Sequence, residues 1–142
     1  MDADAKTKAG VVLYCHGEMG RGMLHAAEMI LGPQSQVEAI GVAPGDGPTA
    51  LAAKLGEAIE RTDGGVGVLV LTDMAGGTPC NLVAARPPTK NVEMVTGFNL
   101  PALLRALRER TEHTDLARLA ADTAAYGGRH IATLRALLVG ED

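Results

Sequence analysis

Short apolar runs alternate with amphipathic segments along the chain, and the two kinds of segment differ in period. Runs with the length and β-branched content of strands lie at residues 11–15, 37–42, 66–71 and 91–96. Apolar residues at helical spacing follow the first run (Met23, Leu24, Ala27, Ile30, Leu31), the second (Leu51, Leu55, Ala58, Ile59) and the fourth (Leu100, Leu103, Leu104, Leu107). The pattern predicts repeated strand–helix units, with the second helix over residues 48–61.

The run at residues 66–71 is the most continuously apolar, which is typical of a parallel strand buried on both faces. It leads toward a helix through Gly76-Gly77-Thr78-Pro79. Parallel strands need right-handed crossovers through helices, so we expect an α/β fold with a doubly wound, mainly parallel sheet. With the flavodoxin-like strand order 2-1-3-4, a ligand crevice would lie between the carboxyl ends of strands one and three.

The C-terminal third is less regular. A further helix is expected over residues 114–126, with Gly127-Gly128 as its stop. Residues 130–139 fit a short strand or a terminal helix equally well, and propensity alone does not separate the two.

Length and composition fit one folded domain over residues 1–142, with residues 1–9 as a flexible N-terminus. Net charge is −4 without a Lys/Arg run, which argues against a nucleic-acid partner. The N-terminus lacks the apolar stretch of a signal peptide, and no run is long enough for a membrane span. Cys15 and Cys80 lack metal-site spacing, so we expect reduced thiols, a cytoplasmic protein and no structural zinc.

Two chemistry-bearing residues follow the predicted first and third strands: His16 and Asp73. An imidazole that donates one N–H to a carboxylate has its other nitrogen free as a nucleophile. Thr78 is a plausible helix N-cap, and the backbone N–H groups near Gly76 and Gly77 would form an anion site. Histidine and aspartate are also common at strand ends without any function, and from the pattern alone both interpretations stay open.

Three motifs resemble those of the mannose-family IIA components of the bacterial phosphoenolpyruvate-dependent sugar phosphotransferase system. They are Leu13-Tyr-Cys-His16-Gly-Glu-Met-Gly-Arg-Gly-Met-Leu24, Val70-Leu-Thr-Asp73-Met-Ala-Gly-Gly-Thr-Pro-Cys-Asn81 and Thr96-Gly-Phe-Asn-Leu-Pro-Ala-Leu-Leu104. They occur in the family's order, and the similarity spans about residues 10–135.

The resemblance implies a phosphocarrier. His16 would accept a phosphoryl group from phospho-HPr and pass it to a IIB component, in sugar uptake or its regulation. Asp73 would orient His16, while Gly76, Gly77 and Thr78 would bind the phosphoryl group without a metal or cofactor. The family is a homodimer that exchanges a C-terminal edge strand, which would correspond to residues 130–135.

The sequence departs from the family pattern around the expected site. Met19, Met74-Ala75 and Cys80 stand where many members carry aromatic residues, which leaves the identity of the docking partner open. Met19, Met23 and Met74 could form an apolar docking patch, or could be ordinary packing residues.

Other functions remain as alternatives. Cys15 and Arg21 fit the C-x5-R loop of cysteine phosphatases, whose discriminating test is Cys15→Ser against His16→Ala. The phosphoryl donor of dihydroxyacetone kinase shares the histidine chemistry, and a binding-only flavodoxin-like module has little sequence support. Asp46 lies in a Gly/Pro turn that explains it without a function.

Overall fold

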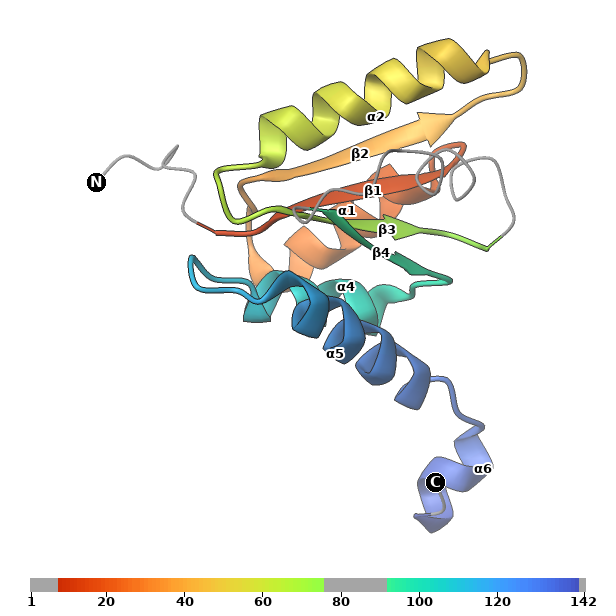
Figure 1. Ribbon diagram of the computed structural model, residues 1–142. Helices are drawn as coiled ribbons and strands as arrows, with labels where there is room; N and C mark the ends of the chain where they lie inside the picture. The colour runs from red at the N-terminus through yellow and green to blue at the C-terminus, as the bar shows by residue number, and fades with distance from the viewer. Residues whose placement is uncertain (1–7, 76–91, 141–142) are drawn as a thin grey trace.

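A computed structural model describes residues 8–75 and 92–140, which form a parallel sheet flanked by helices (Figure 1). The strands are β1 (Gly10–His16), β2 (Val37–Val42), β3 (Val68–Thr72) and β4 (Val92–Thr96), in the order β2-β1-β3-β4. All three pairings are parallel. The predicted α/β class and the strand order 2-1-3-4 are confirmed.

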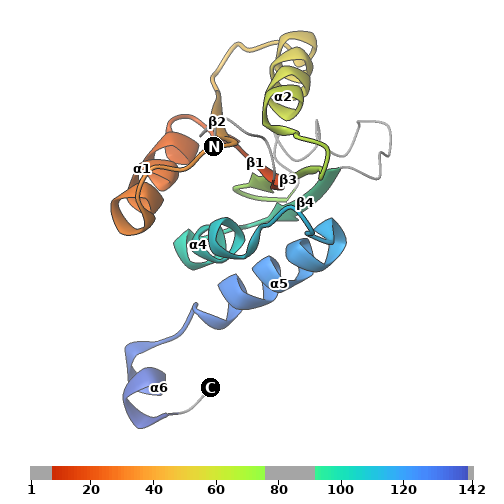
Figure 2. The ribbon, with the colours of Figure 1, turned by 90° about the vertical axis from the view of Figure 1, so that its left-hand side faces the viewer.

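Helices cover both faces of this sheet (Figure 2). One face is covered by α1 (Met19–Leu31) and α4 (Leu100–Glu109), and α5 (Leu116–Arg129) packs against α4 and β4. The other face is covered by α2 (Pro48–Thr62). The short helix α6 (Leu134–Val139) projects away from the rest of the chain. Within the described ranges no helix has the length and apolar character needed to cross a membrane.

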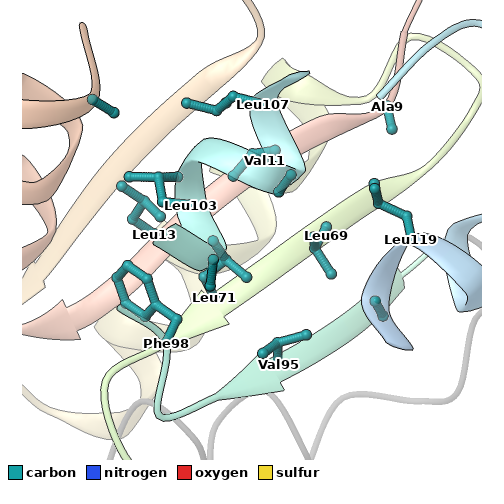
Figure 3. Close-up of a cluster of buried hydrophobic side chains, with 14 of the residues drawn as sticks. Ala9, Val11, Leu13, Leu69, Leu71, Val95, Phe98, Leu103, Leu107 and Leu119 are labelled. Carbon is teal, nitrogen blue, oxygen red and sulfur yellow. The ribbon is translucent and has the colours of Figure 1, made fainter. Parts of the chain in front are cut away.

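The core has two parts because successive strand residues point to opposite faces of the sheet. Val11, Leu13 and Cys15 pack in the cluster under α1 and α4. Figure 3 shows Val11 and Leu13 of this cluster with Leu69 and Leu71 of β3. Val12 and Tyr14 pack on the opposite side in the cluster beneath α2. Every residue of β3 is buried, as expected for a central parallel strand.

Most predicted helical stripes face the core. Residues 51, 55, 58 and 59 of α2 are all buried, and so are Leu103 and Leu107 of α4. The stripe predicted on α1 is partly wrong, because the Ile30 side chain is 55% exposed. Ala27 is the buried residue on that helix, with Met23 and Leu24 packed against the core.

The predicted helix stop at Gly127-Gly128 is wrong, because α5 continues to Arg129. Gly127 serves a close approach between α5 and α4. A Cβ at this position would lie 2.8 Å from the Ala102 Cβ and 2.9 Å from the Asn99 Oδ1. Glycine is therefore needed there for helix packing and does not terminate the helix.

The strand expected over residues 130–135 is not formed in the single chain. The described chain is irregular over residues 131–133 and then helical in α6, where the Thr133 Oγ1 accepts the Ala136 N–H at 3.1 Å. A helix satisfies its backbone groups locally, whereas a strand needs a neighbouring strand. The Leu- and Ala-rich sequence after this N-cap favours a helix, whose hydrogen bonds need no neighbouring strand. No exchanged strand is seen in these residues.

Candidate functional site

The structure brings His16 and Asp73 together at the carboxyl edge of the sheet. His16 is the last residue of β1, and Asp73 directly follows β3, the parallel neighbour of β1. The His16 Nδ1 lies 2.8 Å from the Asp73 Oδ2. An ionised carboxylate only accepts hydrogen bonds, so Nδ1 carries the proton and donates it. The opposite ring nitrogen, Nε2, then holds a lone pair.

Asp73 is the more deeply buried partner, with a side chain 10% exposed against 47% for His16. Its Oδ2 also accepts the backbone N–H of His16 at 2.9 Å, and its Oδ1 accepts the Met74 N–H at 3.1 Å. Burial by itself raises the pKa of Asp73, but the hydrogen bonds and charge of His16 outweigh it and hold that pKa below its usual range. The carboxylate is therefore a fixed, ionised acceptor beneath an accessible imidazole.

A tight turn after β1 sets the position of the His16 backbone. Gly17 has a φ of +58°, and its N–H donates to the Val42 carbonyl at 2.9 Å. Across the turn, a Cβ at Gly41 of β2 would collide with the Gly17 carbonyl oxygen. Gly41 is not among the site residues predicted from the sequence. The available signal was a glycine inside a strand, which commonly marks a close backbone approach.

A cavity of about 420 Å³ opens beside His16, between the turn at Gly17 and the loop 42–46. Asp46 shapes the far wall, where its Oδ2 accepts the Ala43 N–H at 2.8 Å and its own N–H donates to the Ala43 carbonyl at 3.1 Å. These bonds are the turn chemistry expected for Asp46. The cavity leaves room for a reactant next to the imidazole.

Only some of the other predicted site residues lie in the part of the chain that the structure describes. Gly76, Gly77 and Thr78, the expected phosphoryl-binding residues, lie outside the described residues, and so does Cys80. Met19 and Met74 are exposed, whereas Met23 packs against the core. Of the methionines considered for a docking patch, Met23 is thus a packing residue. Within residues 8–75 and 92–140, no cluster of three or more His, Cys, Asp or Glu could hold a metal.

Cys15 is unsuited to nucleophilic chemistry. Its side chain is fully buried in the core, and burial, followed by the charge of Asp73, raises the pKa of the thiol to about 12. Arg21, the other residue of the C-x5-R pattern, is paired with Glu18 at 3.2 Å on the exposed face of α1. Burial and the neighbouring carboxylate both disfavour the thiolate of Cys15, so the geometry opposes the phosphatase alternative.

Comparison with known families agrees with this geometry. Residues 10–124 match the family model described as "PTS system fructose IIA component", which covers most of the chain. The chain belongs to this family of IIA components. Membership in a sugar phosphotransferase family favours neither the dihydroxyacetone-kinase donor nor the cysteine phosphatase.

The relatives of this IIA chain include both longer and similar-sized proteins. It is 31% identical over 127 residues to the mannose-specific EIIAB component of Escherichia coli K12, which covers 89% of the chain and 39% of that protein. The chain thus spans about two fifths of that relative's length. It is 32% identical over 107 residues to the fructose-specific EIIA component of Bacillus subtilis 168, covering 75% of the chain and 73% of that protein.

Solved structures show the same fold. The mannose/sorbose-specific IIA subunit from Enterococcus faecalis has a TM-score of 0.79 at 29% identity, covering 89% of this chain and 95% of that one. A PTS IIA protein associated with a fucose utilization operon in Streptococcus pneumoniae has a TM-score of 0.82 at 25% identity, covering 94% and 98%. The IIA fold therefore extends over nearly the whole chain.

Proposed function

We propose that the chain is a phosphocarrier of the sugar phosphotransferase system. His16 accepts a phosphoryl group from phospho-HPr and passes it to a IIB component. The observation that carries this proposal is the 2.8 Å bond between the His16 Nδ1 and the Asp73 Oδ2, beside an open cavity. That bond selects the tautomer in which Nε2 is the nucleophile.

The transfer is an exchange of one nitrogen–phosphorus bond for another. The Nε2 lone pair attacks the phosphorus of the donor's phosphohistidine. As the new bond forms, the bond from phosphorus to the donor nitrogen breaks, and its electron pair returns to the donor ring. The His16 ring gains positive charge, which the ionised Asp73 carboxylate stabilises from 2.8 Å. Passage to IIB repeats the exchange with His16 as the leaving group.

Positioning supplies most of the catalysis in such a transfer. The proposed phosphoryl-binding groups are the backbone and hydroxyl donors of Gly76, Gly77 and Thr78, which would neutralise the phosphoryl charge without a metal. The proposed setting is the cytoplasm, where HPr and IIB would meet the chain. No nucleic acid or direct membrane insertion has a part in this mechanism.

A homodimer is also part of the proposal. The C-terminal arm, residues 130–140, exposes a group of large apolar side chains: Ile131, Leu134, Leu137, Leu138 and Val139. The arm extends away from the chain's own core (Figure 2), and a concentration of exposed apolar side chains in one short segment is typical of a subunit contact. Light scattering should give a dimer mass for the wild type and a monomer mass for L137E/L138E. M29E, which charges an exposed apolar position on α1, is the control. A monomeric wild type would contradict this part of the proposal.

The carrier function is tested by intact mass after incubation with phosphoenolpyruvate, enzyme I and HPr. We expect one phosphoryl adduct that is acid-labile and base-stable, as a phosphohistidine is, and that is absent from His16→Ala. His25→Ala is the matched control, because His25 is an exposed histidine on α1. An adduct that persists in His16→Ala, or no adduct with active donors, would overturn the assignment.

A further inference from the structure

The turn after β4 is hydrogen-bonded to the end of β3, the strand that Asp73 directly follows. The N–H groups of Gly97 and Phe98 both point to the Thr72 carbonyl, at 3.0 and 3.4 Å. Thr72 is the last residue of β3 and directly precedes Asp73. The orientation of the peptide entering Asp73 therefore depends on where residues 97 and 98 lie.

The core and the backbone conformation restrict this turn. The Phe98 side chain is buried in the cluster with Leu13 and Leu71, as Figure 3 shows. Gly97 has a φ of +74°, which side-chain-bearing residues rarely adopt. The turn therefore has a defined shape between β4 and α4.

Asn99 connects this turn to two helices. Its Oδ1 accepts the Ala102 N–H at 3.0 Å, which makes it the N-cap of α4. Its Nδ2 donates to the Gly127 carbonyl of α5 at 2.9 Å. The missing side chain of Gly127 allows this approach, since a Cβ there would lie 2.9 Å from the Asn99 Oδ1. One side chain thus fixes the turn against α4 and α5 together.

We propose that Asn99 is a positioning residue for the His16–Asp73 pair. It holds the Gly97–Phe98 turn, the turn holds the Thr72 carbonyl, and the Thr72–Asp73 peptide sets the direction of the carboxylate that orients His16. The consequence for rate rests on the proposed carrier function. The consequence for the imidazole tautomer does not, because that tautomer is a property of the unphosphorylated protein.

Three variants separate positioning from general stability. Asn99→Ala removes both side-chain bonds. Asn99→Ser keeps an oxygen able to cap α4 but loses the bond to Gly127. Asp115→Ala is the matched control, because Asp115 caps α5 by accepting the Arg118 N–H at 3.2 Å and makes no bond to the turn after β4 among the described residues. Loss of either cap should lower the urea midpoint by a similar amount.

The first readout is the ¹⁵N NMR signature of the His16 ring in the unphosphorylated protein. In the wild type we expect a single tautomer with the proton on Nδ1. In Asn99→Ala the two nitrogen shifts should move toward each other, because a misplaced carboxylate no longer selects one tautomer. Asn99→Ser should recover most of the wild-type separation, and Asp115→Ala should leave it unchanged.

The second readout is the second-order rate constant for phosphorylation by phospho-HPr. Asn99→Ala should lower it about tenfold, a typical effect of a small misplacement of a reacting group. Asn99→Ser should come within about threefold of the wild type, since the cap is retained. Wild-type tautomer separation in Asn99→Ala would overturn the proposal, even if its stability falls. A wild type that takes no phosphoryl group would instead overturn the carrier function, and the tautomer data would still decide the role of Asn99.

Discussion

Charged side chains have different roles at the carboxyl ends and at the amino ends of the parallel strands. At the carboxyl edge, His16 and Asp73 form one pair, and His16 lines an open cavity. At the amino edge, the Arg110 side chain is 4% exposed, and its guanidinium donates to the carbonyls of Ala9, Ser35 and Gln36 and to the Gln34 Oε1. Burial lowers the pKa of Arg110 to about 10.

Arg110 has a structural role, whereas the His16–Asp73 pair is arranged for chemistry. Arg110 joins the end of α4 to the starts of β1 and β2 through bonds of 2.7 to 3.2 Å, mostly to backbone carbonyls. Such an arrangement stabilises the fold and leaves little capacity for a ligand. The His16–Asp73 pair satisfies the carboxylate while keeping one reactive atom accessible. Substitutions at the two edges should therefore separate stability from activity.

The largest expected effect on stability is at Arg110. Arg110→Met should lower the free energy of unfolding by about 3 kcal/mol, because the guanidinium's hydrogen bonds to the carbonyls of Ala9, Ser35 and Gln36 are lost together. Arg110→Lys should lower the free energy of unfolding by less, since an ammonium keeps the charge and some of the hydrogen bonds. Urea unfolding measures both. Below the unfolding transition the phosphorylation rate should stay near the wild-type value, and a parallel loss of rate would contradict the separation between the two edges.

Asp73→Asn is the counterpart at the carboxyl edge. An amide keeps the shape of the side chain but not its charge, so the His16 tautomer is no longer selected and the developing ring charge is not stabilised. We expect the phosphorylation rate to fall about a hundredfold. Stopped-flow mixing with phospho-HPr, or quench-flow with labelled donor, gives the rate. An unchanged rate and extent of phosphorylation would show that Asp73 does not orient His16.

Gly41→Ala tests the turn that carries His16. The added Cβ collides with the Gly17 carbonyl oxygen, so the turn must move, and we expect about a tenfold loss of phosphorylation rate. Gly22→Ala is the control, because a Cβ at Gly22 on α1 meets nothing within 4 Å. That control should keep its rate and gain slightly in stability through a less flexible unfolded chain. Equal rates in the two variants would remove Gly41 from the site.

The smallest expected effect is a change in the free energy of unfolding at acid pH. The folded-state pKa of Asp73 is lowered, so its ionised form adds stability that is complete above the unfolded-state pKa of about 3.9 and is lost as the pH falls through the folded-state pKa. Urea unfolding from pH 7 downward should show that the stability difference between the wild type and Asp73→Asn shrinks below about pH 4. A difference that grows on acidification would contradict the lowered pKa.

Local pattern and chain handedness were enough to predict much of this protein from its sequence. The apolar periods identified the strands and the main helices, and the observed order β2-β1-β3-β4 is the flavodoxin-like order assumed for the predicted parallel sheet. The ends of adjacent parallel strands share one edge of the sheet, so His16 and Asp73 could be expected to meet before any distance was known. These features depend on residues that are close in sequence or on rules common to all parallel sheets.

Only the tertiary structure decided features that depend on contacts between distant segments. Gly127 has the sequence signature of a helix stop, but its contact with Ala102 and Asn99 makes it a packing residue inside α5. Arg110 is an ordinary charged residue in the sequence, yet it is buried against carbonyls about 75 to 100 positions away. The residues after His130 could be a strand or a helix, because a strand requires a partner edge that local sequence cannot specify. Local propensity is contained in the sequence, whereas the neighbours that override it are set only when the chain is folded.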